Sequence, residues 1–110
     1  MTNNNECVEL GQMILQLYKA TDKAVAVTQL PETRPVALDY IEALEFAAHL
    51  SVPALGPLAT DARSKAIAAK QYIIDKDDWA SARRALLAAG ATLEEAIFKT
   101  VINCACDRKP

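Results

Sequence analysis

The sequence predicts an all-α protein, a compact bundle of four to five helices in one domain that spans residues 1–110. About a fifth of the residues are alanine, the best helix former. Three glycines and five prolines are few for a turn-rich β protein. Apolar residues recur every three or four positions, as on one buried face of a helix. Short disordered tails are expected at residues 1–4 and 107–110.

Two long helices are expected in the first half of the chain. Asn5–Thr28 forms the first, and its inward side is expected to carry Cys7, Leu10, Ile14, Leu17, Thr21 and Ala24. Thr33 can cap the second, which runs to about Ser51. Its inward side is expected to carry Ala37, Tyr40, Ile41, Leu44, Ala47 and Ala48. Two prolines and a glycine in Val52–Pro57 then predict a forced break.

Three shorter helices are expected in the second half. The third runs from about Pro57 to Ile74, with Ala59, Ala62, Ala66, Ala69 and Ile73 on one stripe that lets a neighbouring helix approach closely. Asp77 is expected to cap a fourth helix that Gly90 stops. That helix carries Trp79, Ala82, Leu86 and Ala89 inward. Thr92–Glu95 reads as a capping box that opens a fifth helix, with Leu93, Ala96, Ile97, Val101 and Cys104 inward.

The charge balance excludes several partners. Lys and Arg total 12, Asp and Glu total 14, and the pI is near 5.3, so the chain does not attract nucleic acid or an anionic membrane surface. The N-terminus lacks the features of a signal peptide, and no apolar run is long enough to span a bilayer. We therefore expect a cytoplasmic protein whose three cysteines are reduced thiols.

The sequence carries no catalytic motif, which predicts a protein that is not an enzyme and has no cofactor and no metal. It contains no Gly-rich phosphate loop and no Gly-x-Ser-x-Gly. One carboxylate–imidazole cluster exists, because Glu42, Glu45 and His49 share a side of the second helix. The spacing and the single histidine do not fit a di-iron bundle site. The cluster is interpreted as a solvated acidic face or as a partner for cations on the next helix, and an enzyme would have to use His49 with Glu45.

A second stripe on the third helix supplies the functional hypothesis. Arg63, Ile67, Lys70 and Ile74 lie beside the alanine stripe, so the helix is apolar around about half its girth. We therefore expect a non-catalytic interaction module that self-associates, as a homodimer, or caps a protein partner through this stripe. In the alternative interpretation, Arg63 and Lys70 meet the acidic side of the second helix within one chain.

A second hypothesis belongs to another class, a helical protein that binds a small anion such as a nucleotide or an acidic metabolite. Four cations would gather around the anion, namely Arg63, Lys70, Arg83 and Arg84. Tyr72 or Trp79 would form an apolar wall.

Overall fold

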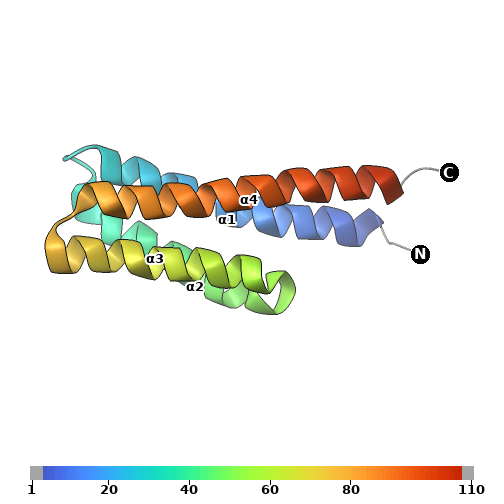
Figure 1. Cartoon of the computed structure of the whole chain (residues 1–110), viewed down its shortest axis with the longest axis horizontal. Coiled ribbons are helices and arrows are strands. Elements are labelled where there is room, and N and C mark those ends of the chain that lie inside the picture. Colours follow the sequence, from blue (N-terminus) through green and yellow to red (C-terminus); the bar gives the residue numbers. More distant parts are fainter. Residues whose placement is uncertain (1–3, 108–110) are drawn as a thin grey trace.

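The structure is a computed structural model that describes the backbone of residues 4–107 and the side chains of residues 6–102. Over this range the chain forms four α-helices and one short 3-10 helix (Figure 1). The elements are α1 (Asn4–Gln29), η1 (Arg34–Val36), α2 (Ala37–Leu55), α3 (Pro57–Lys76) and α4 (Trp79–Asp107). The all-α prediction is therefore confirmed. The helices begin and end one residue inside the two expected tails, and the rest of each tail lies outside the described residues.

The four helices pack in a ring, in which α1 contacts α2 and α4, and α3 contacts the same two helices. Short connections make successive helices antiparallel. α1 has 26 residues and α4 has 29, whereas α2 has 19 and α3 has 20. At 1.5 Å per residue the first pair is about 10 Å longer. In Figure 1, α1 and α4 accordingly extend past the α2/α3 turn at the end that holds both termini.

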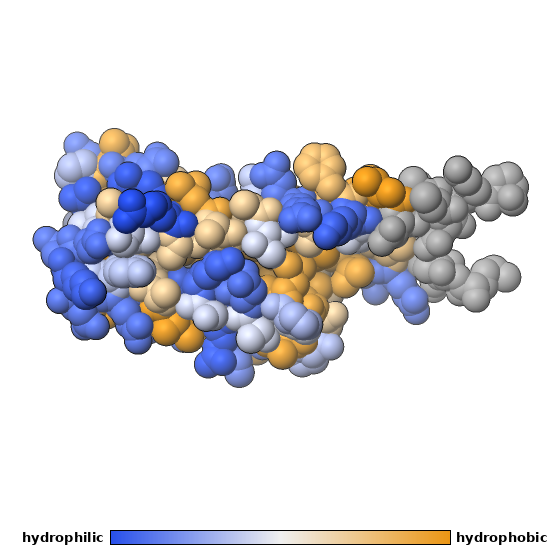
Figure 2. Space-filling model, viewed as in Figure 1, coloured by the Kyte–Doolittle hydropathy of each residue, from blue (hydrophilic) through white to orange (hydrophobic). Residues whose placement is uncertain are grey.

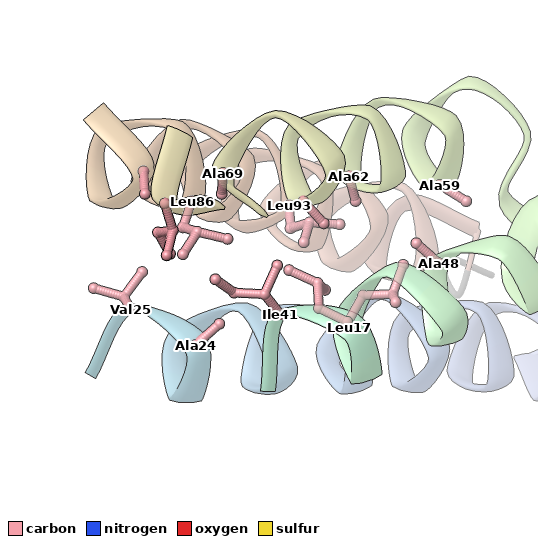
Figure 3. Packing of buried hydrophobic residues seen from close by; sticks show 14 of the residues in the cluster. Leu17, Ala24, Val25, Ile41, Ala48, Ala59, Ala62, Ala69, Leu86 and Leu93 are labelled. Carbon is pink, nitrogen blue, oxygen red and sulfur yellow. The ribbon is translucent and has the colours of Figure 1, made fainter. Parts of the chain in front are cut away.

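Small side chains dominate the core. The stripe expected on α3 is confirmed, because Ala59, Ala62, Ala66 and Ala69 are at most 1% exposed and Ile73 is 9% exposed. These alanines face larger side chains from the other helices, including Leu17, Ile41, Leu86 and Leu93 (Figure 3). Because a methyl group occupies little space, the axis of α3 can approach its neighbours closely while leucine and isoleucine fill the remaining volume.

Three residues expected in the core are exposed instead. Tyr40 is 42% exposed, Leu10 is 38% exposed and Val101 is 60% exposed. Leu10 lies near the first turns of α1, where the longer pair passes the end of α2 and α3 (Figure 1). Val101 stands three residues after Phe98 and seven after Glu94, on a second stripe of α4. A stripe can point inward only where neighbouring helices exist to cover it.

The predicted break at Gly90 is wrong, because α4 runs without interruption from Trp79 to Asp107. The Thr92 hydroxyl does not cap a new helix; it donates to the Ala88 carbonyl oxygen at 3.2 Å, within α4. A glycine inside a helix costs only about 1 kcal/mol. The buried residues of α4 are Ala82, Leu86, Ala89 and Leu93, and their four-and-three spacing continues across Gly90. Packing of this uninterrupted stripe outweighs the local preference to stop.

The predicted break at Val52–Pro57 shrinks to one residue, Gly56. Pro53 lies inside the last turn of α2, where its missing N–H removes a single helical hydrogen bond. Gly56 has φ 57° and ψ −129°, a conformation that favours glycine over residues with a side chain. α3 starts immediately afterwards with Pro57 at its first position, where proline is well tolerated.

Asp78, and not Asp77, caps the start of α4. The Ser81 backbone N–H donates to Oδ1 of Asp78 at 3.0 Å, and the Ala82 N–H donates to the Asp78 carbonyl oxygen at 3.2 Å. The side-chain and backbone hydrogen bonds from Ser81 lower the pKa of the Asp78 carboxyl. Asp77 instead ends α3 in the left-handed conformation, with φ 51°. The N-cap of α4 therefore lies one residue later than the sequence predicts.

The expectation of reduced thiols is wrong for Cys7, which is disulfide-bonded. The antiparallel pairing of α1 and α4 brings the first turns of one helix beside the last turns of the other, so Gly11 lies next to Thr100. This proximity is not visible in the cysteine count. The side chains of Cys104 and Cys106 lie outside the described residues.

Candidate functional site

A charged hollow lies between α2 and α3. It has a volume of about 500 Å³. Its lining brings together the acidic side of α2 and the two cations of the predicted α3 stripe, namely Glu42, Glu45, Phe46, His49, Arg63 and Lys70. The sequence indicated both halves of this hollow separately, and the antiparallel packing of α2 on α3 joins them.

At one end of the hollow, Lys70 of α3 lies against glutamates of α2. The Lys70 ammonium lies 3.2 Å from Oε1 of Glu45, to which it donates a hydrogen bond, and 3.9 Å from Oε1 of Glu42. The Lys70 side chain is 28% exposed and that of Glu45 is 25% exposed. This geometry confirms the intramolecular interpretation for Lys70, because its charge is already balanced by α2.

The other end of the hollow carries Arg63. Arg63 and His49 both line this part of the hollow, and both are exposed. Among the described side chains, no carboxylate lies within ion-pair distance of Arg63. Phe46 lines the same hollow and is 64% exposed.

The two apolar members of the predicted α3 stripe differ in their surroundings. Ile67 is half-buried, whereas Ile74 is 61% exposed near the end of α3. Lys70 separates them and is engaged by α2. Whether this stripe binds a partner stays a prediction, but its exposed apolar surface is interrupted.

Among four cavities of the described residues, none brings the four cations of the predicted anion site together. Arg63 and Lys70 line the α2/α3 hollow. Arg83 instead donates through Nη2 to the Thr28 carbonyl oxygen at 3.0 Å, close to the end of α1, where a cation also favours the helix dipole. Arg84 donates to the Ser81 hydroxyl oxygen at 3.0 Å. Trp79, one of the two residues predicted to form the apolar wall, already contacts a cation of the chain, because the Arg34 guanidinium lies 4.8 Å from the centre of its ring.

Sequence reasoning missed a second stripe on each of the two long helices. On α1 this outer stripe steps by three and four residues through Val8, Gly11, Leu15, Tyr18 and Asp22. On α4 it steps in the same way through Leu87, Ala91, Glu94, Phe98 and Val101. A second stripe at this spacing is the pattern that packs one helix against another in coiled coils. The signal was present in the sequence, but the break expected at Gly90 hid its continuity.

The two outer stripes form one exposed face, which we call the outer face. Tyr18, Asp22, Leu87, Ala91 and Glu94 line a shared groove between α1 and α4. The stripes continue beyond this groove toward the termini. The large apolar side chains of the face are well exposed: Val8 45%, Leu15 37%, Leu87 52%, Phe98 62% and Val101 60%. Figure 2 also shows apolar surface between the projecting ends of α1 and α4 and the α2/α3 turn, on the side that faces α2 and α3 and not on the outer face.

Neither a metal site nor a membrane span is present in the described part of the chain. No group of histidine, cysteine, aspartate and glutamate side chains there could hold a metal ion. None of the helices, as far as they are described, combines the length and the apolar character that a bilayer crossing demands. Comparisons with protein-family models, curated proteins and solved structures give no match. The geometry of the bundle itself is therefore the basis on which a function can be proposed.

Proposed function

We propose that this protein is a non-catalytic interaction module that self-associates as a homodimer through the outer face of α1 and α4. The observation that carries the proposal is the pair of outer stripes at coiled-coil spacing on two adjacent helices. A helix with apolar stripes on two sides is suited to packing on both sides. α2 and α3 cover only the inner side, so the outer side is available to a second copy.

The size of the outer face fits a weak dimer. Each stripe covers fourteen residue steps, about 21 Å, and two helices side by side are about 20 Å wide. The resulting face of about 400 Å² per copy lies at the low end of protein interfaces, where association is weak. A two-fold axis would place the same face against itself, as in most homodimers.

The composition of the outer face follows that of a protein interface. The apolar part of the face lies toward the end of the bundle that holds the termini, and it is formed by Phe98, Val101, Val8 and Leu15. Asp22 and Glu94 lie farther along the face and supply polar groups near its other end. Because buried aromatic residues contribute most to binding in such interfaces, Phe98 is the side chain on which dimerisation should depend most.

Analytical ultracentrifugation tests the proposal directly. The expected mass of the wild-type protein is twice the chain mass of 11.9 kDa. Phe98→Glu places a charge in the apolar part of the outer face and should yield a monomer, because burying an unpaired charge in an interface is costly. The helical circular dichroism signal of this variant should stay unchanged, since Phe98 is exposed within one chain.

Phe46→Glu is the matched control. Phe46 is 64% exposed, close to the 62% of Phe98, but it lies on α2 outside the outer face. This variant should keep the dimer mass. A wild-type protein that sediments as 11.9 kDa at millimolar concentration would contradict the proposal, and so would a Phe98→Glu variant that remains dimeric.

A further inference from the structure

We infer that Cys7 forms its disulfide with Cys104 of α4, and that this bond clasps the end of the bundle that α2 and α3 leave uncovered. Cys7 is disulfide-bonded, and the chain has two other cysteines, Cys104 and Cys106. The register of α1 against α4 distinguishes between these two candidates. The clasp is separate from the outer face and does not depend on dimerisation.

Two contacts between described residues fix the register of α1 against α4. A Cβ at Gly11 would lie 3.8 Å from Cγ2 of Thr100. A Cβ at Gly90 would lie 3.6 Å from Cγ2 of Thr21. The two contacts are ten residues apart on α1 and also ten residues apart on α4, in the opposite chain direction. Equal steps in opposite directions mean that the two antiparallel helices keep one register between these contacts.

The same register leads from Gly11 and Thr100 to two cysteine positions. Four residues before Gly11 stands Cys7 on α1, and four residues after Thr100 stands Cys104 on α4. Because residues four apart lie on the same side of a helix, these two cysteine positions are opposite each other. Position 106 stands two residues further along α4, about 200° around the helix, and therefore on its other side.

The close approach of α1 and α4 at this end suits a disulfide. Such a bond requires two Cα atoms that are about 4.4–6.8 Å apart. Gly11 has no side chain to separate the helices, and the methyl group of Thr100 lies close to the α1 backbone there. Cys7 is half-buried one turn away from this contact.

The bond supplies an attachment that packing does not provide at this end of the bundle. α1 and α4 extend past the α2/α3 turn here, and Leu10 is 38% exposed although it continues the inward stripe of α1 (Figure 1). Helix ends fray when they are not tied down, because most helical stability in proteins comes from a packed face. A covalent link holds the two helices together where α2 and α3 do not reach.

The clasp opens by thiol–disulfide exchange with a dithiol. The Sγ–Sγ bond accepts two electrons and breaks, each sulfur takes up one proton from the dithiol, and the dithiol is oxidised to a cyclic disulfide. Molecular oxygen can restore the bond by taking two electrons and two protons from the two thiols, which yields hydrogen peroxide. The oxidation state of the cysteines therefore sets how firmly the ends of α1 and α4 are held.

Alkylation of the full chain tests the pairing. The protein is equilibrated with air, unfolded without a reductant and treated with N-ethylmaleimide, and tandem mass spectrometry then locates the label. We expect one label per chain, on Cys106. A label on either of the other two cysteines would overturn the pairing.

Thermal denaturation at low protein concentration tests the clasp in the monomer. A dithiol should lower the Tm of the wild type by about 10 °C, because a disulfide that closes a long loop restricts the unfolded chain. Cys104→Ser should melt about 10 °C lower than the wild type without a reductant and should not respond to the dithiol. The matched variant Cys106→Ser should behave like the wild type. A wild-type Tm that the dithiol leaves unchanged would overturn the clasp, and so would equal effects of the two serine variants.

Discussion

The α2/α3 pair and the α1/α4 pair each carry a second stripe beside the one that forms the core, and the two stripes have different fates. On α3 the second stripe holds two cations, and one of them is paired with glutamates on α2. On α1 and α4 the second stripes are mainly apolar at the end near the termini and remain exposed. A second stripe therefore indicates an interface only when the adjacent helix does not already satisfy it.

The largest expected effect distinguishes the two sides of α4. Leu93 is fully buried on the inner side, whereas Leu87 is 52% exposed on the outer face. Leu93→Ala should lower the free energy of unfolding by about 2–5 kcal/mol, because it leaves a cavity in the core. Leu87→Ala should change it by less than about 0.5 kcal/mol. Chemical denaturation at one low protein concentration measures both, and equal losses would show that α4 does not present these two sides as described.

A smaller effect of opposite sign tests the continuity of α4. Gly90→Ala should raise the free energy of unfolding by about 0.5–1 kcal/mol, because alanine favours a helix interior. A Cβ at this position would lie 3.6 Å from Cγ2 of Thr21, an ordinary contact distance. Gly11→Ala on α1 is the matched variant, with its nearest contact at 3.8 Å from Thr100. Thermal denaturation checks both, and destabilisation by Gly90→Ala alone would mean that the helix requires glycine at this point.

The smallest effect concerns the ion pair of the α2/α3 hollow. Lys70→Gln should lower the free energy of unfolding by about 0–1 kcal/mol, because the pair is partly exposed. The sedimentation mass should not change, since Lys70 lies outside the outer face. A variant that loses the dimer mass would instead restore the stripe of Arg63, Ile67, Lys70 and Ile74 as the interface.

The stripes of the core could be read from the sequence with few errors. The α3 alanines were all placed correctly, because the periodicity of a helix depends only on residue spacing. The expectation for Leu10 was wrong because its burial depends on how far α2 and α3 reach, and that for Val101 was wrong because it belongs to the second stripe of α4. The charges of the hollow were identified, but the contrast between Lys70 and Arg63 needed the register of α2 against α3.

The local signals for helix ends were the least reliable part of the prediction. Gly90, Thr92 and Pro53 all carry such signals, and α2 and α4 run through them. Each signal is worth about 1–3 kcal/mol in an isolated helix. A continuous buried stripe contributes more than that when it packs along its whole length.

The sequence by itself determined that this chain is helical and which side of each helix faces inward, because both properties arise from neighbours within about four residues. Only the tertiary structure decided which helices are long, which second stripes are covered and which cation lacks a carboxylate. These outcomes depend on the register and the relative lengths of packed helices, which join residues that are far apart in the chain.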